Sequence, residues 1–289
     1  MQAARIVSER GRVKQFDVIC AGETLWKLAD RASPSGDMRL RPGGGAVNVA
    51  LALARQGLRV GLATVLADDE LGRKSVEKIA AARIDVGGVM LAARRAGLAL
   101  LDASGGAKQV SLAPPDEVPL EVPAGWSSQV MLLSGLSPVV PHAAALCKAA
   151  RSARRHGALV LIDFNASFHA WAGRDPRTVR MLLREVDVAR CSYADLAVLG
   201  MDVATARASL RPGAVLIVSD AEGGAVAIGP FGEVTFVPRP VVARRPRGAG
   251  DAFTAAVCSE LTRPREPGES AEALWYAALR RGYVASLAS

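Results

Sequence analysis

Residues 247–255 read R-G-A-G-D-A-F-T-A, and the interpretation of the whole chain starts from them. Gly248, Ala249 and Gly250 are small enough for backbone to approach a ligand closely, and the residues after Asp251 predict a buried helix. A glycine-rich turn that enters a helix directs free amides and the positive end of the helix dipole at one point. That point suits a phosphate or an oxyanion, and Asp251 beside it suits a proton acceptor for an alcohol. The stretch therefore predicts phosphoryl transfer to a hydroxyl.

The same stretch also fits a tight turn whose aspartate caps the following helix, with no ligand involved. Short glycine patterns occur by chance, so this one does not decide between the two interpretations alone. The remainder of the chain has to favour one of them.

The length and composition are those of an ordinary α/β protein. The chain has 289 residues, half of them hydrophobic, which is enough for one large domain or two smaller ones. No apolar run approaches the length of a membrane span. Residues 1–15 are charged and lack an apolar signal core. We therefore expect them to form a loose leader, and we expect the protein to be cytoplasmic.

The formal charge of +8 is compatible with nucleic acid, and it suits an anionic small substrate such as a nucleotide equally well. The arginines are mostly dispersed, and no basic run is interleaved with aromatic residues. We therefore expect neither a nucleic-acid partner nor a membrane partner.

The cysteines and histidines do not have the spacing of metal ligands. The four cysteines stand in apolar contexts without a C-x-x-C pair, which favours buried free thiols. The sequence thus indicates no protein metal site. The cysteines are Cys20, Cys147, Cys191 and Cys258.

Apolar strand-like runs alternate with helical segments through most of the chain. Such alternation predicts an α/β fold with a mostly parallel sheet covered on both faces, whose ligands bind at the carboxyl ends of the strands. Glycines and polar residues such as Gly22, Ser134, Asp163 and Ser219 fall at those ends. The expected strands are 16–22, 60–66, 84–89, 130–135, 158–165, 186–191 and 215–219, and the expected helices are 46–57, 141–156, 178–185 and the segments after 68 and 251.

A second glycine patch, P-G-G-G-A-V-N-V-A at 42–50, leads into another helix. Gly43, Gly44 and Gly45 allow backbone to approach a ligand, and Asn48 offers both a donor and an acceptor to hydroxyls. The alternative is a flexible loop with Asn48 as a surface residue. The helix that follows favours the ligand-binding interpretation.

Two segments interrupt the α/β alternation. Residues 94–115 contain alternating strands around a hairpin signal at 103–106, and residues 24–41 contain a turn at 33–36. We expect these two segments to form a small sheet separate from the main body.

Taken in order, these motifs resemble the ribokinase-like (PfkB-type) carbohydrate kinase family over nearly the whole length. The patch at 42–50 matches the sugar-site motif of the family, and R-G-A-G-D-A-F matches its second signature, usually D-T-T-G-A-G-D-x-F. L-A-D-D-E-L-G at 66–72 resembles its G-x-D-x-x-G stretch, and I-D-F-N at 162–165 its D-x-N strand end. The pattern is closest to the subgroup of 2-keto-3-deoxygluconate kinases and fructokinases.

The resemblance implies a three-layer, doubly wound sheet over 16–289, with segments 24–41 and 94–115 as a β-sheet lid through which a homodimer forms. It implies ATP-dependent phosphorylation of a sugar or sugar-acid hydroxyl, with Mg²⁺ arriving with ATP. Asp251 would be the general base and the amides of 248–250 would hold the phosphoryl group. Gly43, Gly44, Gly45 and Asn48 would hold the sugar. Dependence on a monovalent cation is left open.

Several positions depart from the family pattern. Lys27 stands where the first strand of the family usually continues to a sugar-binding aspartate, and it predicts a different or an anionic sugar. The family motifs for the nucleotide, phosphate and magnesium are altered, as are the residues before G-A-G-D. The residues that still map to the ATP site are Asn165, Asp195, Ser219, Gly224 and Arg247.

Three functions remain open on the sequence alone. The leading one is an active kinase for a sugar or sugar acid. The altered motifs motivate a second, in which a catalytically weak member binds a sugar or nucleotide as a sensor. A nucleic-acid-binding protein is the third, and the dispersed arginines do not favour it.

Overall fold

The computed structural model describes residues 15–22, 24–30, 38–93, 98–101, 107–111, 120–134, 143–166, 177–238 and 248–288. Its strands are β1 (Phe16–Gly22), β2 (Leu25–Asp30), β3 (Met38–Gly43), β4 (Val60–Ala67), β5 (Ile84–Ala92), β6 (Leu98–Leu101), β7 (Ala107–Ser111), β8 (Ser128–Ser134), β9 (Leu159–Asp163), β10 (Val188–Ser192), β11 (Val215–Ser219), β12 (Ala225–Gly229) and β13 (Gly232–Phe236). Its helices are α1 (Gly45–Arg55), α2 (Glu70–Ala81), α3 (Ala143–Arg155), α5 (Arg177–Leu183), α6 (Tyr193–Val198), α7 (Val203–Ser209), α8 (Ala249–Thr262) and α9 (Ala271–Leu287).

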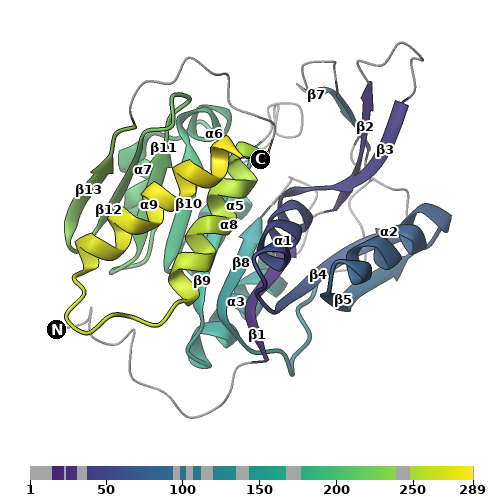
Figure 1. Cartoon of the computed structure of the whole chain (residues 1–289), viewed down its shortest axis with the longest axis horizontal. Helices are drawn as coiled ribbons and strands as arrows, with labels where there is room; N and C mark the ends of the chain where they lie inside the picture. The colour runs from purple at the N-terminus through teal and green to yellow at the C-terminus, as the bar shows by residue number, and fades with distance from the viewer. Residues whose placement is uncertain are drawn as a thin grey trace.

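The main sheet has nine strands in the order β13-β12-β11-β10-β9-β8-β1-β4-β5 (Figure 1). Every pair from β11 to β5 is parallel, and only the β11–β12 and β12–β13 pairs are antiparallel. The predicted strands are therefore in place, and the prediction of a mostly parallel sheet is confirmed. β5 runs on to Ala92, three residues beyond the expected end at 89.

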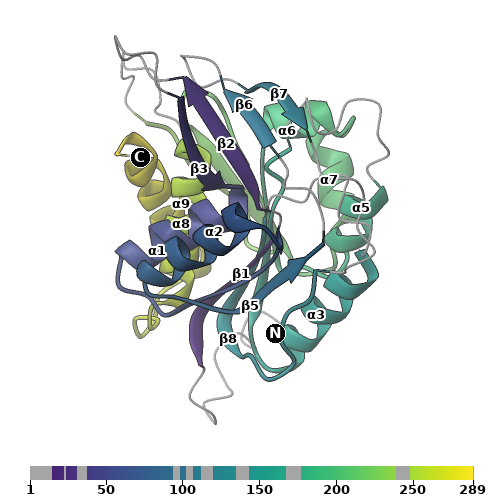
Figure 2. The same ribbon diagram turned by 90° about the vertical axis from the view of Figure 1, so that its right-hand side faces the viewer.

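The central strands alternate between two hydrophobic cores, as strands buried on both faces must. In β8, Val130 and Leu132 pack into one core, whereas Met131 and Leu133 pack into the other. The first core also holds side chains of α1, α8 and α9, and the second holds those of α3, α5, α6 and α7. Figure 2 shows these two groups of helices on opposite faces of the sheet. The predicted three-layer fold is confirmed.

A second sheet has four strands in the order β3-β2-β6-β7. β2 pairs with β6 in parallel, and the two other pairs are antiparallel. The sheet stands beyond the carboxyl end of β1, because β2 follows β1 after two residues (Figures 1 and 2). It is built from the segments expected to form a small sheet; its proposed use as a lid or dimer surface stays a prediction.

Two further observations concern the whole chain. All four cysteines are buried free thiols, as predicted. Among the described residues, no helix is long and apolar enough to cross a membrane. The predicted leader, except for its last residue Gln15, and the predicted ATP contact Arg247 lie outside the described residues.

Candidate active site

The two glycine motifs of the sequence form the N-termini of two helices that pack against each other (Figure 1). Gly44 precedes α1 with a φ of 112°, and Gly248 precedes α8 with a φ of 81°. Side chains other than that of glycine rarely adopt such positive φ angles. The glycines therefore set the direction in which each helix begins.

Asp251, in the first turn of α8, is held by two side-chain amides from distant parts of the chain. Asn48 Nδ2 of α1 donates a hydrogen bond of 2.6 Å to Asp251 Oδ2. Asn165 Nδ2, two residues beyond the end of β9, donates one of 3.0 Å to Asp251 Oδ1. Asn165 has a φ of 43°, an uncommon conformation that tends to occur at functional positions. Three predicted site residues therefore meet at one carboxylate.

The backbone amides next to Asp251 suit an anion. The first intrahelical hydrogen bond of α8 runs from Ala252 N to Gly248 O at 2.8 Å, so the amides of Ala249, Gly250 and Asp251 have no acceptor within the helix. They also lie at the positive end of the helix dipole. This geometry is what an anion hole requires.

Burial raises the pKa of Asp251 from its ordinary value of 3.8 to about 6. The hydrogen bond from Asn48 lowers the pKa, and the nearby negative charge of Asp163 raises it. The positive charges of Lys27 and Arg190 also lower it. A carboxylate with a pKa near 6 is ionised at neutral pH and is a stronger base than an ordinary aspartate.

Lys27 extends from β2 across Gly43, the last residue of β3. A methyl group on Gly43 would lie 2.7 Å from both Cδ and Cε of Lys27, so the glycine makes room for the lysine stem. The positive charge of Lys27 is one of the charges that lower the pKa of Asp251. Arg41 lies directly opposite Lys27 in the register of β2 and β3.

A buried polar network lies between the sheet and the first turns of α8. Arg190 Nη1 donates to Asp163 Oδ1 at 3.2 Å, and Arg190 Nη2 donates to Ser219 Oγ at 3.1 Å. Asp163 Oδ2 accepts a hydrogen bond of 2.6 Å from Thr254 Oγ1 of α8. Phe253 lies beneath the guanidinium, whose carbon is 5.4 Å from the ring centroid. The network ties α8 to the carboxyl ends of β9, β10 and β11.

Two residues predicted for the ATP site have other partners in the structure. Asp195 Oδ2 accepts from the amide and hydroxyl of Ser192 at 2.7 and 2.6 Å, and its Oδ1 accepts from Ala166 N at 2.7 Å. Asp195 N donates in turn to Ser192 Oγ at 3.1 Å, and this bond together with the one from Ser192 N forms a capping box that begins α6. Ser219 is buried and accepts from Arg190. The contacts give Asp195 and Ser219 structural roles, and their contacts with ATP stay predictions.

Gly224 stands in the turn between β11 and β12 and packs against the start of that turn. A methyl group at this position would lie 2.4 Å from Asp220 Oδ2, and Gly223 N donates to Asp220 Oδ1 at 2.6 Å. A side chain at position 224 would therefore displace the carboxylate of Asp220. A contact with the nucleotide at Gly224 stays a prediction.

The sequence interpretation missed Arg190 and Thr254, and it gave Asp163 no role. Arg190 interrupts an otherwise apolar run in β10, and a charged residue inside such a run is rarely buried without a partner. That irregularity is a signal that the sequence contains. The partners Asp163 and Thr254 are distant in the chain, and only the fold brings them to Arg190.

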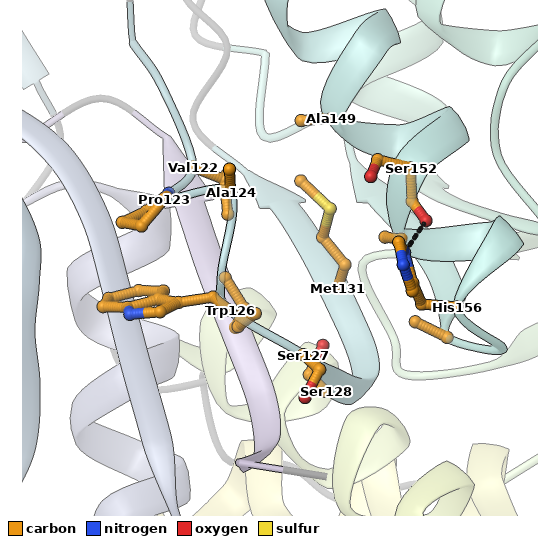
Figure 3. A pocket seen from close by; sticks show the side chains of 13 residues that line it. Val122, Pro123, Ala124, Trp126, Ser127, Ser128, Met131, Ala149, Ser152 and His156 are labelled. Carbon is orange, nitrogen blue, oxygen red and sulfur yellow. Dashed lines mark hydrogen bonds between the residues drawn. The ribbon is translucent and has the colours of Figure 1, made fainter. Parts of the chain in front are cut away.

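A pocket lies elsewhere, between α3 and the segment that leads into β8 (Figure 3). Trp126, Met131 and His156 are among its lining residues, and His156 Nδ1 donates to Ser152 O at 2.8 Å. None of the predicted site residues lines it, and it adjoins Ser128 at the beginning of β8, whereas Asp251 lies near the carboxyl ends of the strands. The pocket is therefore separate from the site around Asp251.

Among the described residues, no group of three or more histidine, cysteine, aspartate or glutamate side chains is placed to hold a metal ion.

The chain is similar to known proteins in sequence and in fold. The chain is 28% identical to the fructokinase of Klebsiella pneumoniae over 261 residues, which cover 82% of this chain and 84% of that protein. A PfkB protein from Polaromonas sp. JS666 has a similar structure, with a TM-score of 0.73, 24% identity and coverage of 94% of both chains. A double mutant of the Vibrio cholerae fructokinase has a TM-score of 0.75 at 18% identity and covers 96% of this chain and 93% of its own.

The aminoimidazole riboside kinase of Salmonella enterica has a TM-score of 0.70 at 23% identity, with coverage of 92% of this chain and 90% of its own. The sequence model of pfkB family carbohydrate kinases matches residues 15–288, nearly the full length. The resemblance seen in the sequence motifs is thereby confirmed, and the chain belongs to the pfkB family of carbohydrate kinases.

Proposed function

We propose that the protein transfers the γ-phosphoryl group of ATP to a hydroxyl of a small sugar or sugar acid, with Asp251 as the general base. As a pfkB family member the chain is an ATP-dependent carbohydrate kinase; the proposal adds the residue roles and the acceptor class. The observation that carries it is the placement of Asp251, fixed by Asn48 and Asn165 beside the free amides of α8.

In the proposed reaction the acceptor hydroxyl gives its proton to Asp251 as its oxygen attacks the γ-phosphorus. A new oxygen–phosphorus bond forms, the bond from the γ-phosphorus to the bridging oxygen breaks, and ADP leaves. Charge builds up on the phosphoryl oxygens, and the amides of Gly248, Ala249 and Gly250 would stabilise it. Mg²⁺, when bound with ATP, would neutralise part of the phosphate charge.

The acceptor would lie between α1 and the four-stranded sheet. Gly43, Gly44, Gly45 and Asn48 would contact it, because they lie at or next to the helix end that meets Asp251. Lys27 and Arg41 are two like charges opposite each other in neighbouring strands, an arrangement that is unfavourable unless an anion lies nearby. This favours an acceptor that carries a negative charge.

The nucleotide would lie on the other side of Asp251, towards Asn165 and Gly224, and a contact with Arg247 stays a prediction. The Salmonella kinase was crystallised with aminoimidazole riboside and an ATP analogue, and the Vibrio fructokinase with fructose, ADP and potassium. These ligands support the proposal that this chain also binds a sugar and a nucleotide together. Other points stay predictions: the use of Mg²⁺ or of a monovalent cation, a cytoplasmic location, and a homodimer formed through the four-stranded sheet.

A second candidate is a catalytically weak member that senses a sugar or nucleotide. It is favoured by Asp195 and Ser219, which stand in altered nucleotide motifs and whose polar atoms are bonded within the protein. The carboxylate of Asp251 beside free amides argues against it, because an anion-binding site without catalysis gains nothing from a negative charge there.

A coupled assay of ADP release tests the two candidates. It should cover fructose, ribose, 2-keto-3-deoxygluconate, other aldonic acids and nucleosides, with the wild type, Asp251→Asn and the control Asp202→Asn, an exposed cap of α7. We expect turnover of at least one compound, a loss of ~10²–10⁴-fold in Asp251→Asn, and an unchanged rate in the control. Absence of turnover, together with a higher melting temperature in ATP or a sugar, would favour the sensor.

A further inference from the structure

Arg190 is a buried cation directly behind the first turn of α8. Only 8% of the residue is exposed, and it lies near the carboxyl end of β10 in the middle of the main sheet. A methyl group on Gly250 would lie 3.5 Å from Nη1 and 3.6 Å from Nη2 of Arg190. The guanidinium therefore lies next to Gly250, in the helix turn whose amides would hold the phosphoryl group.

Stabilisation of the fold does not by itself explain why a buried arginine stands at position 190. The guanidinium has one carboxylate partner, Asp163, and within the described residues its Nε is buried without a hydrogen-bond partner. Burying such a pair is weak evidence for stability, because hydrophobic residues of similar volume often stabilise a fold as well or better. A charge kept at this position therefore points to a role in the chemistry.

We propose that Arg190 is a positioning residue for phosphoryl transfer, which fixes the first turn of α8 and places a permanent positive charge behind its amides. It would act through the helix end and would not touch the sugar or the nucleotide. The inference rests on the proposed function, since it assumes that negative charge develops in front of Gly248, Ala249 and Gly250. A fixed charge close to developing charge favours the transition state, because it needs no reorganisation during the reaction.

The proposal also predicts an effect on the general base. Within the described residues, the groups that face Asp251 are Lys27 of β2, Asn48 of α1, Asp163 and Asn165 at the end of β9, and Arg190 of β10. Among them, Arg190 and Lys27 are the positive charges that favour the ionised carboxylate. Removal of the Arg190 charge should therefore make Asp251 harder to ionise.

Two neutral variants separate this role from a structural one. Arg190→Met removes the charge and both hydrogen bonds, whereas Arg190→Gln keeps a donor for Asp163 or Ser219. The matched control is Arg263→Met, since Arg263 stands at the other end of α8 and pairs with Glu260 and Glu269. For each variant, melting temperature, kcat, sugar KM and the pH dependence of kcat/KM are measured.

We expect both Arg190 variants to lower kcat by ~10–100-fold with little change in the KM for the sugar. We also expect the acid limb of the pH profile, where kcat/KM falls because Asp251 becomes protonated, to move to higher pH by about one unit. Arg190→Lys should return the acid limb to its wild-type position, because the charge is restored. Arg263→Met should lower the melting temperature without moving the limb.

An unmoved acid limb and a wild-type kcat in Arg190→Gln overturn the inference, and so does an equal shift in Arg263→Met. If Arg190→Met does not fold, Arg190→Gln alone decides. Asp251→Asn identifies which proposal fails. Wild-type turnover in that variant refutes the proposed function itself, whereas a large loss there with normal Arg190→Gln refutes only the role of Arg190.

Discussion

Asn48 and Asp251 are 203 positions apart in the chain, yet a hydrogen bond of 2.6 Å joins their side chains. The bond connects the first turn of α1 to the first turn of α8. Each helix begins at a glycine motif, so the two motifs form one site. The side-chain nitrogen of Asn48 donates this bond. Its side-chain oxygen can still accept a hydrogen bond from a hydroxyl of the sugar that receives the phosphoryl group.

Replacement of Asn48 by alanine should weaken the base. The hydrogen bond from Asn48 lowers the pKa of Asp251, so its loss should raise that pKa above about 6. We expect kcat/KM to fall ~10–100-fold at pH 7 and its acid limb to move to higher pH. A pH–rate profile checks this, with Gln56→Ala at the exposed end of α1 as the control. An unmoved limb would mean that Asn48 does not act on Asp251.

The pH dependence of stability gives a test that needs no substrate. The pKa of Asp251 is raised from 3.8 to about 6 by folding, so the unfolded chain loses its proton first as the pH rises. The ionised carboxylate therefore lowers stability progressively from about pH 4 to pH 6–7, by at most about 3 kcal/mol, and the penalty is absent below pH 4.

Asp251→Asn removes this titration. The difference in unfolding free energy, variant minus wild type, should increase between pH 4 and pH 7 and stay constant above. An asparagine can accept from only one of Asn48 and Asn165, and that loss is an offset that does not depend on pH. Urea unfolding at several pH values measures the difference, and a flat line would contradict the raised pKa.

The sequence predicts the architecture because the signals are local and periodic. Continuous apolar runs identify buried strands such as β8 and β11, and the glycine motifs identify the starts of α1 and α8. The long helix α9 was not predicted. Its buried residues recur every three or four positions, but Gly282 in its interior and exposed Tyr276 and Val284 obscure the pattern.

The site is predictable only where a residue belongs to a motif. Asp251 and Asn48 were identified in this way, and the fold shows that they touch. Arg190 was missed, because its contacts with Asp163 and Gly250 depend on strand order and helix placement. Asp195 was assigned to ATP by analogy, although S-x-x-D is itself a capping-box pattern. The structure confirms the capping box, and a contact of Asp195 with ATP stays a prediction.

A variant at Lys27 tests whether the sugar that receives the phosphoryl group carries a negative charge. Lys27→Met keeps most of the stem that lies over Gly43 and removes the ammonium. We expect kcat/KM for an anionic sugar to fall at least ~10-fold relative to a neutral one, since a charged contact contributes about 1.5–3 kcal/mol. The assay is run at pH 8, where Asp251 is ionised with or without the lysine.

Arg41→Met is the matched control for Lys27, since Arg41 lies opposite it on β3 and is exposed. If both variants lower the preference for the anionic sugar, the two cations share the anion. An unchanged preference in both variants would remove Lys27 from the acceptor site.

Gly282 of α9 lies close to the ring of Phe253 in α8. A methyl group at Gly282 would lie 2.6 Å from Cδ2, 2.7 Å from Cε2 and 2.9 Å from Cγ of the Phe253 ring. The ring is 1% exposed and lies against the guanidinium of Arg190 on the side of the sheet, so it has little room to move.

Gly282→Ala should therefore lower both stability and activity. Alanine favours a helix by up to ~1 kcal/mol over glycine, but forcing a methyl group into a packed core costs about 1–3 kcal/mol, so the clash should prevail. Thermal unfolding and kcat test this, with Gly125→Ala, where a methyl group meets no atom within 4 Å, as the control. The double variant with Phe253→Leu should recover part of the loss, because a smaller side chain relieves the contact. A stable and fully active Gly282→Ala would show that α9 does not set the position of the helix that carries Asp251.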